Sequence, residues 1–173
     1  FQMYAQDFDE TLPVCYYNTP PGSTRVFPDG STAAAGPWLW IHMIYPYVNN
    51  DGIFNCPTGS GHYAGGYYWD YAAAYAYNRW VGKYPTNNER PTPISIVKKP
   101  AETPLLADCD YYLMGPDSNY ADNDRRPTDR HNDMLNMAYV DGHVKTIKLD
   151  ACVTDGVMSN TDITWVHWVP AYQ

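Results

Sequence analysis

The apolar positions along the chain predict a few short elements joined by long polar connections. In Phe1–Glu10 the apolar residues recur at helical spacing and stop before a Thr-Leu-Pro stretch, which predicts an amphipathic helix. This segment opens without a capping residue, so we expect it to be the end of a longer helix whose beginning is missing. The apolar run Gly36–Val48 contains Pro37, a residue suited to a first helical turn, and predicts a short helix over Trp38–Tyr45.

Later segments have strand patterns. Ala74–Trp80 alternates with tyrosines on one face, and Thr103–Ala107 is a short continuous apolar run that suits a buried central strand. Two further strand-like runs, NMAYV and HVKTI, flank Asp141 and Gly142. Asp-Gly between such runs predicts a hairpin with a two-residue type I′ turn, which needs positive φ at both central residues. One helix followed by strands that pair through hairpins predicts an α+β fold with an antiparallel sheet.

One domain accounts for the whole pattern, and 173 residues are enough to bury a core. We divide it into the helix end (1–12), a connecting region with the short helix (13–66), the sheet with its hairpin (67–150) and a tail (151–173). The tail contains a late apolar run, ITWVHWVP. Residues 112–129 are expected to form a long, polar, acidic loop, because they show no strand pattern.

Composition changes this picture in three ways. Tyrosine (17), tryptophan (6) and phenylalanine (4) together outnumber isoleucine, leucine and valine, so we expect an aromatic core with tyrosine hydroxyls at its margin. The formal net charge of −8 disfavours binding to nucleic acid or to an anionic membrane. No apolar run of the sequence reaches the roughly 18 residues that a membrane span needs.

The four cysteines contain no CxxC pair, which argues against zinc-ribbon and thioredoxin-like sites. Their even number in a chain rich in Tyr, Asn and Gly is typical of an exported protein with two disulfides, and four buried thiols are the alternative. Sequence alone leaves three pairings open. Cys15 follows the N-terminal helix and Cys56 lies in a loop that must return near it, which favours the pair Cys15–Cys56. Cys109 ends the central strand and Cys152 follows the hairpin expected beside that strand, which favours the pair Cys109–Cys152.

Several motifs then occur in a characteristic order. A histidine, nine further residues and an Asp-Gly pair are present as His131, the run 132–140, Asp141 and Gly142. Upstream of them the chain contains MYAQDFDETLP, FNCPTG, AYAYN and VKKPAETPLLAD. Together these motifs are spread over most of the chain. In their order the chain resembles the prepilin-type proteins with the processing-associated H-x9-D-G motif, which are type IV pilin-like or pseudopilin-like.

The resemblance implies a pilin-like fold, in which an N-terminal helix packs on an antiparallel sheet with long loops. It implies a structural subunit of an extracellular type IV pilus-like filament or secretion pseudopilus, exported to the cell surface or the periplasm, with no required cofactor. Its partners would be copies of itself or other pilins, bound through the missing N-terminal helix, and the full-length precursor would be inserted in the inner membrane. Mature pilins begin with Phe or a similar residue and carry a glutamate at the fifth position. This chain has Phe1 but Ala5, so we expect that Phe1 is not that mature terminus.

Two interpretations of the motif predict different functions. As chemistry, His131, Asp141 and His143 could begin an acid–base or metal site, but no nucleophile elbow, HExxH or phosphate loop accompanies them. As architecture, His131 hydrogen-bonds locally and fixes the entry into the hairpin, while Asp141 and Gly142 form its turn. We favour the architectural interpretation and predict that the chain is not an enzyme and has no catalytic residues.

Two binding hypotheses accompany it. The acidic loop presents Asp117, Asp122 and Asp124 among other oxygen donors, which could hold calcium, an ion that takes about six to eight oxygens. Some pseudopilins carry calcium in a loop at the sheet edge, although arginines in this loop could instead neutralise the carboxylates. Alternatively, exposed tyrosines and tryptophans could stack on sugar rings, which would make the chain an extracellular carbohydrate-binding module.

Overall fold

The computed structural model describes residues 1–18, 25–26, 32–33, 37–58, 74–83, 91–109, 111–114 and 127–149. The protein is a mixed α+β structure whose main sheet has five strands in the order β7-β5-β6-β8-β9. These strands are β5 (Tyr75–Asn78), β6 (Pro104–Asp108), β7 (Leu113–Met114), β8 (Leu135–Tyr139) and β9 (Val144–Ile147). The sheet is the scaffold on which the polar residues of the H-x9-D-G motif are placed.

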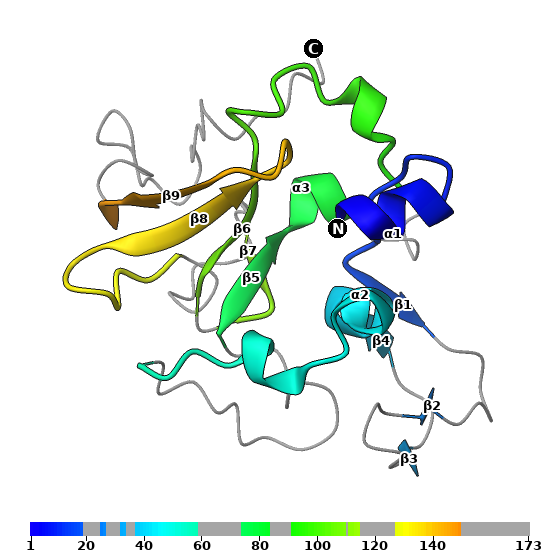
Figure 1. Ribbon diagram of the computed structural model, residues 1–173, viewed down its shortest axis with the longest axis horizontal. Coiled ribbons are helices and arrows are strands. Elements are labelled where there is room, and N and C mark those ends of the chain that lie inside the picture. Colours follow the sequence, from blue (N-terminus) through cyan, green and yellow to red (C-terminus); the bar gives the residue numbers. More distant parts are fainter. Residues whose placement is uncertain are drawn as a thin grey trace.

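Shorter elements surround the sheet. The helical segments are α1 (Gln2–Asp7), α2 (Trp40–Val48), α3 (Arg79–Gly82) and the 3-10 turns η1 (Asp51–Phe54) and η3 (Ile94–Ile96). Two small antiparallel pairs join β1 (Tyr16–Asn18) to β4 (Pro37–Leu39) and β2 (Arg25–Val26) to β3 (Thr32–Ala33). Figure 1 places α1 and α2 on the β5 side of the sheet, away from β9. Among the described residues, no helix is long and apolar enough to cross a bilayer.

The sheet is mixed, whereas the sequence pattern predicted antiparallel pairing throughout. The central strand β6 pairs antiparallel with β5 and with β8, and β8 pairs antiparallel with β9. The exception is β7, which runs parallel to β5 and lies within a segment expected to contain no strand. A two-residue strand is too short to show any periodicity, so the sequence pattern could not indicate it.

The helix after Pro37 begins later than predicted. Residues Pro37–Leu39 extend as β4, so α2 starts at Trp40 rather than at residue 38. His42 accepts the backbone N–H of Leu39 through Nδ1 at 2.9 Å and so satisfies a donor at the start of the helix. The helix ends at Val48, and the capping residue Asn49 adopts the left-handed conformation with φ 49°, as asparagine readily does at this position.

The strand predicted for residues 74–80 is interrupted after Asn78. The Asn78 side chain accepts the backbone N–H of Trp80 at 3.0 Å and caps the short helix α3. Its amide nitrogen donates to the carbonyl oxygen of Pro104 at 2.7 Å and links the cap to β6. A fully buried asparagine with both ends of its side chain paired therefore fixes the point at which β5 becomes helix.

The two faces of the sheet bury different clusters. One cluster is aromatic and packs α2 against β5 and β6, with Trp40, Phe54 and Tyr77 among its buried members. The other consists of small and flexible apolar side chains, which are Ala76, Ala107, Cys109, Met114, Leu135 and Met137. The aromatic core predicted from composition is therefore confirmed for the face that carries α2.

Helix α1 covers the aromatic cluster only in part. Ala5 is fully buried and the Phe1 ring lies 5.2 Å from that of Tyr77, while the Gln2 side chain donates to the carbonyl oxygen of Val140 at 3.0 Å. Met3 and Phe8 are 59% and 48% exposed. The helix thus packs through one narrow stripe and presents apolar side chains to solvent on its remaining surface.

The hairpin predicted at Asp141-Gly142 is confirmed, but the predicted turn type is wrong. The Gly142 N–H donates to the carbonyl oxygen of Tyr139 at 2.9 Å, and the Tyr139 N–H donates to that of His143 at 2.9 Å. Of the two residues in the Asp141-Gly142 pair, Gly142 has positive φ, at 95°, and Asp141 does not. This pattern is typical of a three-residue loop, in which a type I turn is followed by a left-handed glycine.

Replacing Gly142 with alanine should destabilise the fold by about 1 kcal/mol, which corresponds to a fall of about 2–4 °C in Tm. A Cβ at this position would meet no atom within 4 Å, so the cost comes only from the backbone conformation. Gly142→Asn should lose less, because asparagine adopts positive φ more readily than alanine. Thermal melts of both variants test this, and an unchanged Tm for Gly142→Ala would show that the turn does not require this φ.

Candidate functional site

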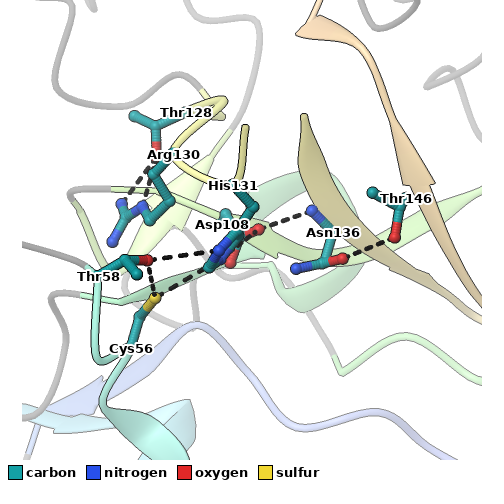
Figure 2. A network of polar contacts seen from close by, with 8 residues as sticks. All are labelled: Cys56, Thr58, Asp108, Thr128, Arg130, His131, Asn136 and Thr146. Atoms are coloured by element: carbon teal, nitrogen blue, oxygen red, sulfur yellow. Dashed lines mark hydrogen bonds and ion pairs between the residues drawn. The ribbon is translucent and has the colours of Figure 1, made fainter. Parts of the chain in front are cut away.

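A polar network gathers around His131, at the point where β6 ends and β8 begins (Figure 2). The imidazole Nε2 lies 3.4 Å from Oδ2 of Asp108 and 3.5 Å from Sγ of Cys56, and Nδ1 lies 3.3 Å from Oγ1 of Thr58. Three separate stretches of the chain meet here: the Cys-Pro segment after η1, the end of β6 and the entry to the hairpin. His131 therefore ties the loop before the sheet to the sheet itself.

A tight turn sets the direction of His131. Asn132 and Asp133 both have positive φ, at 54° and 59°. On either side of them His131 and Met134 exchange two backbone hydrogen bonds, at 3.0 and 3.1 Å. Positive φ at both central residues is typical of a type I′ turn, so the turn that the sequence pattern assigned to Asp-Gly occurs here instead.

Asp108 forms the buried end of the network. Its side chain has no exposed surface, and Oδ2 accepts the backbone N–H of Asn136 at 2.6 Å. Among the described residues Oδ1 has no hydrogen-bond partner. On the far side, Thr146 of β9 donates to Asn136 Oδ1 at 2.8 Å, so polar contacts continue from His131 across the two strands of the hairpin.

The hydrogen-bonding capacities assign a consistent set of proton positions. A neutral imidazole protonated at Nε2 donates to the Asp108 carboxylate and accepts at Nδ1 from the Thr58 hydroxyl. Sγ of Cys56 lies 3.2 Å from Oγ1 of Thr58, so the thiol can donate to that oxygen in turn. In this arrangement the Thr58 hydroxyl both donates and accepts, and Cys56 contacts His131 directly as well as through Thr58.

The network also affects its neighbour Tyr75, which pairs with Asp108 across β5 and β6. Burial raises the pKa of Tyr75, the nearby Cys56 and Asp108 charges raise it further, and the charge of Arg130 acts in the opposite direction. The phenol therefore remains protonated at neutral pH. Arg130 itself donates from Nε and Nη2 to the Thr128 hydroxyl, at 2.9 and 2.7 Å.

The other motif residues lie at the opposite end of β8. Asp141 accepts the backbone N–H and the Nδ1 of His143 at 3.1 and 2.6 Å, and the His143 ring stacks on Tyr139 with centroids 4.3 Å apart. Because the strand β8 separates His131 from Asp141, the structure does not bring the three residues considered for an acid–base site together. Asp141 lies in the turn and His131 at the entry to the hairpin. The architectural interpretation expected local hydrogen bonds for His131, whereas its side chain contacts Cys56, Thr58 and Asp108, which are far away in the sequence.

The contact between Asp141 and His143 predicts a dependence of stability on pH. Desolvation raises the pKa of Asp141, but the hydrogen bonds and the charge of His143 outweigh it and hold this pKa below its usual value. A carboxyl group with a lowered pKa in the folded state stabilises the fold above its unfolded pKa, and this contribution is lost as pH falls through the folded pKa. Between about pH 5 and about pH 2, wild-type stability should therefore fall more steeply than that of Asp141→Asn. Urea unfolding at several pH values measures both slopes, and coincident slopes would contradict the prediction.

The cysteines differ from the predicted pairing. Cys15 and Cys56 are buried thiols in different surroundings, and the expected Cys15–Cys56 bridge is not present. Sγ of Cys15 faces the carbonyl oxygen of Arg79 at 3.8 Å, whereas Cys56 faces His131. Cys109 is a buried thiol in the cluster of small apolar side chains, and its expected partner Cys152 lies outside the described residues.

The calcium hypothesis concerns residues that the structure does not describe. Asp117, Asp122 and Asp124 all lie outside the described ranges, so the proposed ligand set remains a prediction. Within the described ranges, no three His, Cys, Asp or Glu side chains are grouped in a way that could hold a metal ion.

An apolar cavity of about 350 Å³ lies on the same sheet face as Tyr75, between α2, η1 and the strands β6, β8 and β9. Its lining includes Trp40, Ile44, Phe54, Leu106, Ala138 and Val144. Asn136 and Tyr75 provide the polar groups in its wall. The sequence did not predict this cavity, since its lining comes from segments far apart along the chain.

Fold and site together define an α+β protein with a five-stranded mixed sheet and a histidine-centred polar network at one end of it. No family model matches the chain, and no match was found among curated proteins or among solved structures.

Proposed function

We propose that this chain is the globular domain of a non-catalytic structural subunit of a type IV pilus-like filament or secretion pseudopilus. The observation that carries the proposal is the use made of the H-x9-D-G motif. His131 holds the entry to the hairpin against β6, and Asp141 with Gly142 forms the turn at the other end of β8. A motif used in this way specifies a fold, as expected of a subunit whose work is to present a stable surface.

Helix α1 adds a second line of support. In pilin-like filaments, apolar N-terminal helices bundle at the centre and the globular domains meet at the rim. The α1 surface that faces away from the core carries Met3 and Phe8, both substantially exposed. Apolar side chains at these positions would lie against a neighbouring helix in such a bundle, and Ala5 would hold the helix on its own domain.

The upstream coding sequence provides the most direct test. The proposal requires a leader followed by a long apolar helix with glutamate at the fifth position. The extended protein should assemble into filaments visible by electron microscopy, and exchange of that glutamate should block assembly. An upstream region without a leader or apolar helix would refute the proposal.

The 173-residue chain should remain a monomer at micromolar concentration in analytical ultracentrifugation. Contacts between globular domains alone should fall below the roughly 1,000 Å² expected of a stable interface. A tight symmetric oligomer would show that assembly uses a different surface.

A second candidate function is an extracellular binding module, which the apolar cavity favours. Its volume falls within the range of about 300–1,000 Å³ that is usual for small-molecule sites, and Trp40 in its wall would report binding by fluorescence. Val144 stands at its rim and is 63% exposed, so Val144→Trp should block the cavity without disturbing the core. A glycan array and a panel of aromatic compounds test this function. Binding that Val144→Trp abolishes would support it, and an absence of any ligand would count against it.

A further inference from the structure

The geometry points to Cys56 as a thiol activated by His131 and Asp108 for exchange with small disulfides, a chemical role separate from the proposed structural function. Two independent observations carry this inference. Cys56 is within 3.5 Å of the imidazole of His131. Behind that imidazole lies a fully buried carboxylate, Asp108, with one oxygen that has no hydrogen-bond partner among the described residues.

Deprotonation of Cys56 has a short route. The proton can pass from Sγ to the Thr58 hydroxyl at 3.2 Å while that hydroxyl gives its own proton to Nδ1 of His131 at 3.3 Å. The result is a thiolate beside an imidazolium. The Asp108 carboxylate, 3.4 Å from Nε2, then pairs with a cation rather than with a neutral ring. A buried carboxylate gains from such a partner, so the transfer improves the environment of Asp108 while it creates the nucleophile.

The arrangement is not that of a hydrolytic triad. In a triad the carboxylate and the nucleophile bind different nitrogens of the imidazole, which then moves a proton between nucleophile and leaving group. Here Cys56 and Asp108 both approach Nε2. The site can therefore stabilise a thiolate, and the chemistry that needs only a thiolate is exchange with a disulfide.

Cys56 is the most exposed of the three thiols that the structure describes, with 8% of its surface exposed. Pro57 and Thr58 next to Cys56 are exposed, and the His131 side chain is 30% exposed. Cys15 and Cys109 have no exposed surface. A small reagent that approaches over Thr58 therefore meets Cys56 at the margin of the fold, while the other two thiols stay inside clusters of apolar side chains.

The reaction balances without a further oxidant. The Cys56 thiolate attacks one sulfur of a disulfide R–S–S–R, the new Cys56–S–S–R bond forms as the old S–S bond breaks, and R–S⁻ leaves and takes up a proton. Addition of the R–S group removes the contact of Sγ with His131, so the Cys-Pro segment loses one of its attachments to the sheet. Modification should therefore loosen this segment relative to β6.

Peptide mapping can test the inference on the whole chain, with glutathione disulfide as the probe. Trypsin places the four cysteines in separate peptides, which are Phe1–Arg25, Val26–Arg79, Lys99–Arg125 and Leu149–Gln173. At pH 7 the adduct should form on the Cys56 peptide about tenfold faster or more than on the Cys15 and Cys109 peptides, because an ordinary thiol is only a few per cent ionised there. Equal rates for the three would overturn the inference.

Two variants distinguish activation from simple exposure. In His131→Asn the rate at Cys56 should fall about tenfold at pH 7 and recover at high pH, where any thiol ionises. Thr58→Val keeps the shape of an exposed side chain and should reduce the rate through loss of the hydroxyl route alone. If both variants keep the wild-type rate and the wild-type pH profile, His131 does not activate Cys56. Circular dichroism of each variant confirms that the fold persists, and the outcome leaves the filament proposal untouched.

Discussion

Replacing Trp40 with alanine is expected to remove about 3–5 kcal/mol of stability, because Trp40 is the largest fully buried side chain among the described residues. Trp40 is 1% exposed, with the rings of Phe1 and Tyr77 each 5.7 Å away and that of Phe54 at 6.3 Å. Its Nε1–H also donates to the carbonyl oxygen of Tyr112 at 2.9 Å. Since a domain is stable by only about 5–15 kcal/mol in total, the variant should lose a substantial part of its free energy of unfolding.

Two matched variants separate the contributions. Trp40→Phe keeps a buried ring but loses the hydrogen bond. The Tyr112 carbonyl oxygen still accepts the Tyr77 N–H at 3.0 Å, so it is not left without a partner. Loss of the hydrogen bond should therefore cost only about 1 kcal/mol, in addition to the cost of the smaller buried ring. Trp80→Ala is the same substitution at a tryptophan that is 40% exposed, and it should cost less than about 1 kcal/mol. Urea unfolding followed by circular dichroism measures all three. A Trp40→Ala protein as stable as Trp80→Ala would show that the aromatic cluster does not hold α2 on the sheet.

The elements that the sequence predicted are those with a local pattern. The central strand was expected at residues 103–107 and lies at Pro104–Asp108, because a continuous apolar run describes a strand buried on both faces. The hairpin was expected from two alternating runs around Asp-Gly, and β8 and β9 pair as predicted. In each case the signal and the structure it specifies occupy the same few residues.

The turn type could not be read in that way. Val140 is fully buried and its N–H donates to the carbonyl oxygen of Thr103 at 3.0 Å. This contact with a segment far away in the sequence places Val140 in the loop and makes the turn three residues long. Asp-Gly suits both a two-residue and a three-residue loop, so only the tertiary contact decides between them.

The same limit applies to the network around His131. Cys56 and His131 are 75 positions apart, and Asp108 lies on the strand between them in the chain order. Each belongs to a different motif of the sequence: the Cys-Pro segment, the Leu-Leu-Ala-Asp stretch and the histidine of the H-x9-D-G motif. That they form one contact set depends on how β6 and β8 align, which no local pattern specifies.

The cysteine pairing illustrates a different limit. Counting an even number of cysteines gave two disulfides, yet the structure places Cys15 against Arg79 and Cys56 against His131. Bridging two cysteines needs their Cα atoms within about 7 Å, and sequence spacing gives no measure of that distance. The cysteine count indicates a class of protein, and only the tertiary arrangement indicates what each thiol contacts.

Gly82 in helix α3 shows how completely packing can reverse a local preference. In a helix glycine is less favourable than alanine by about 1 kcal/mol, so the helix propensity of this position, taken by itself, would favour Gly82→Ala. In the structure, a Cβ on Gly82 would lie 2.6 Å from Sγ of Cys15 and still closer to the ring of Tyr77. Neither neighbour has any exposed surface. Tyr77 is also held by its hydroxyl, which donates to the carbonyl oxygen of Pro13 at 2.8 Å, so its ring cannot move aside without losing a buried hydrogen bond.

Gly82→Ala is therefore expected to cost about 3 kcal/mol, at the upper end of the usual range for overpacking, and to lower Tm by about 6–12 °C. Removal of one clashing atom should restore part of this loss. The double variant Cys15→Ala with Gly82→Ala should lose less stability than the sum of the losses in the two single variants. The difference, which is the coupling energy, should be about 1 kcal/mol or more. Gly52→Ala provides the control, because its Cβ would meet only the exposed side chain of Asn50, at 3.1 Å, and the effect should be small. If Gly82→Ala is as stable as the wild type, or if its cost adds fully to that of Cys15→Ala, then α3 does not pack against Cys15 and Tyr77 as described.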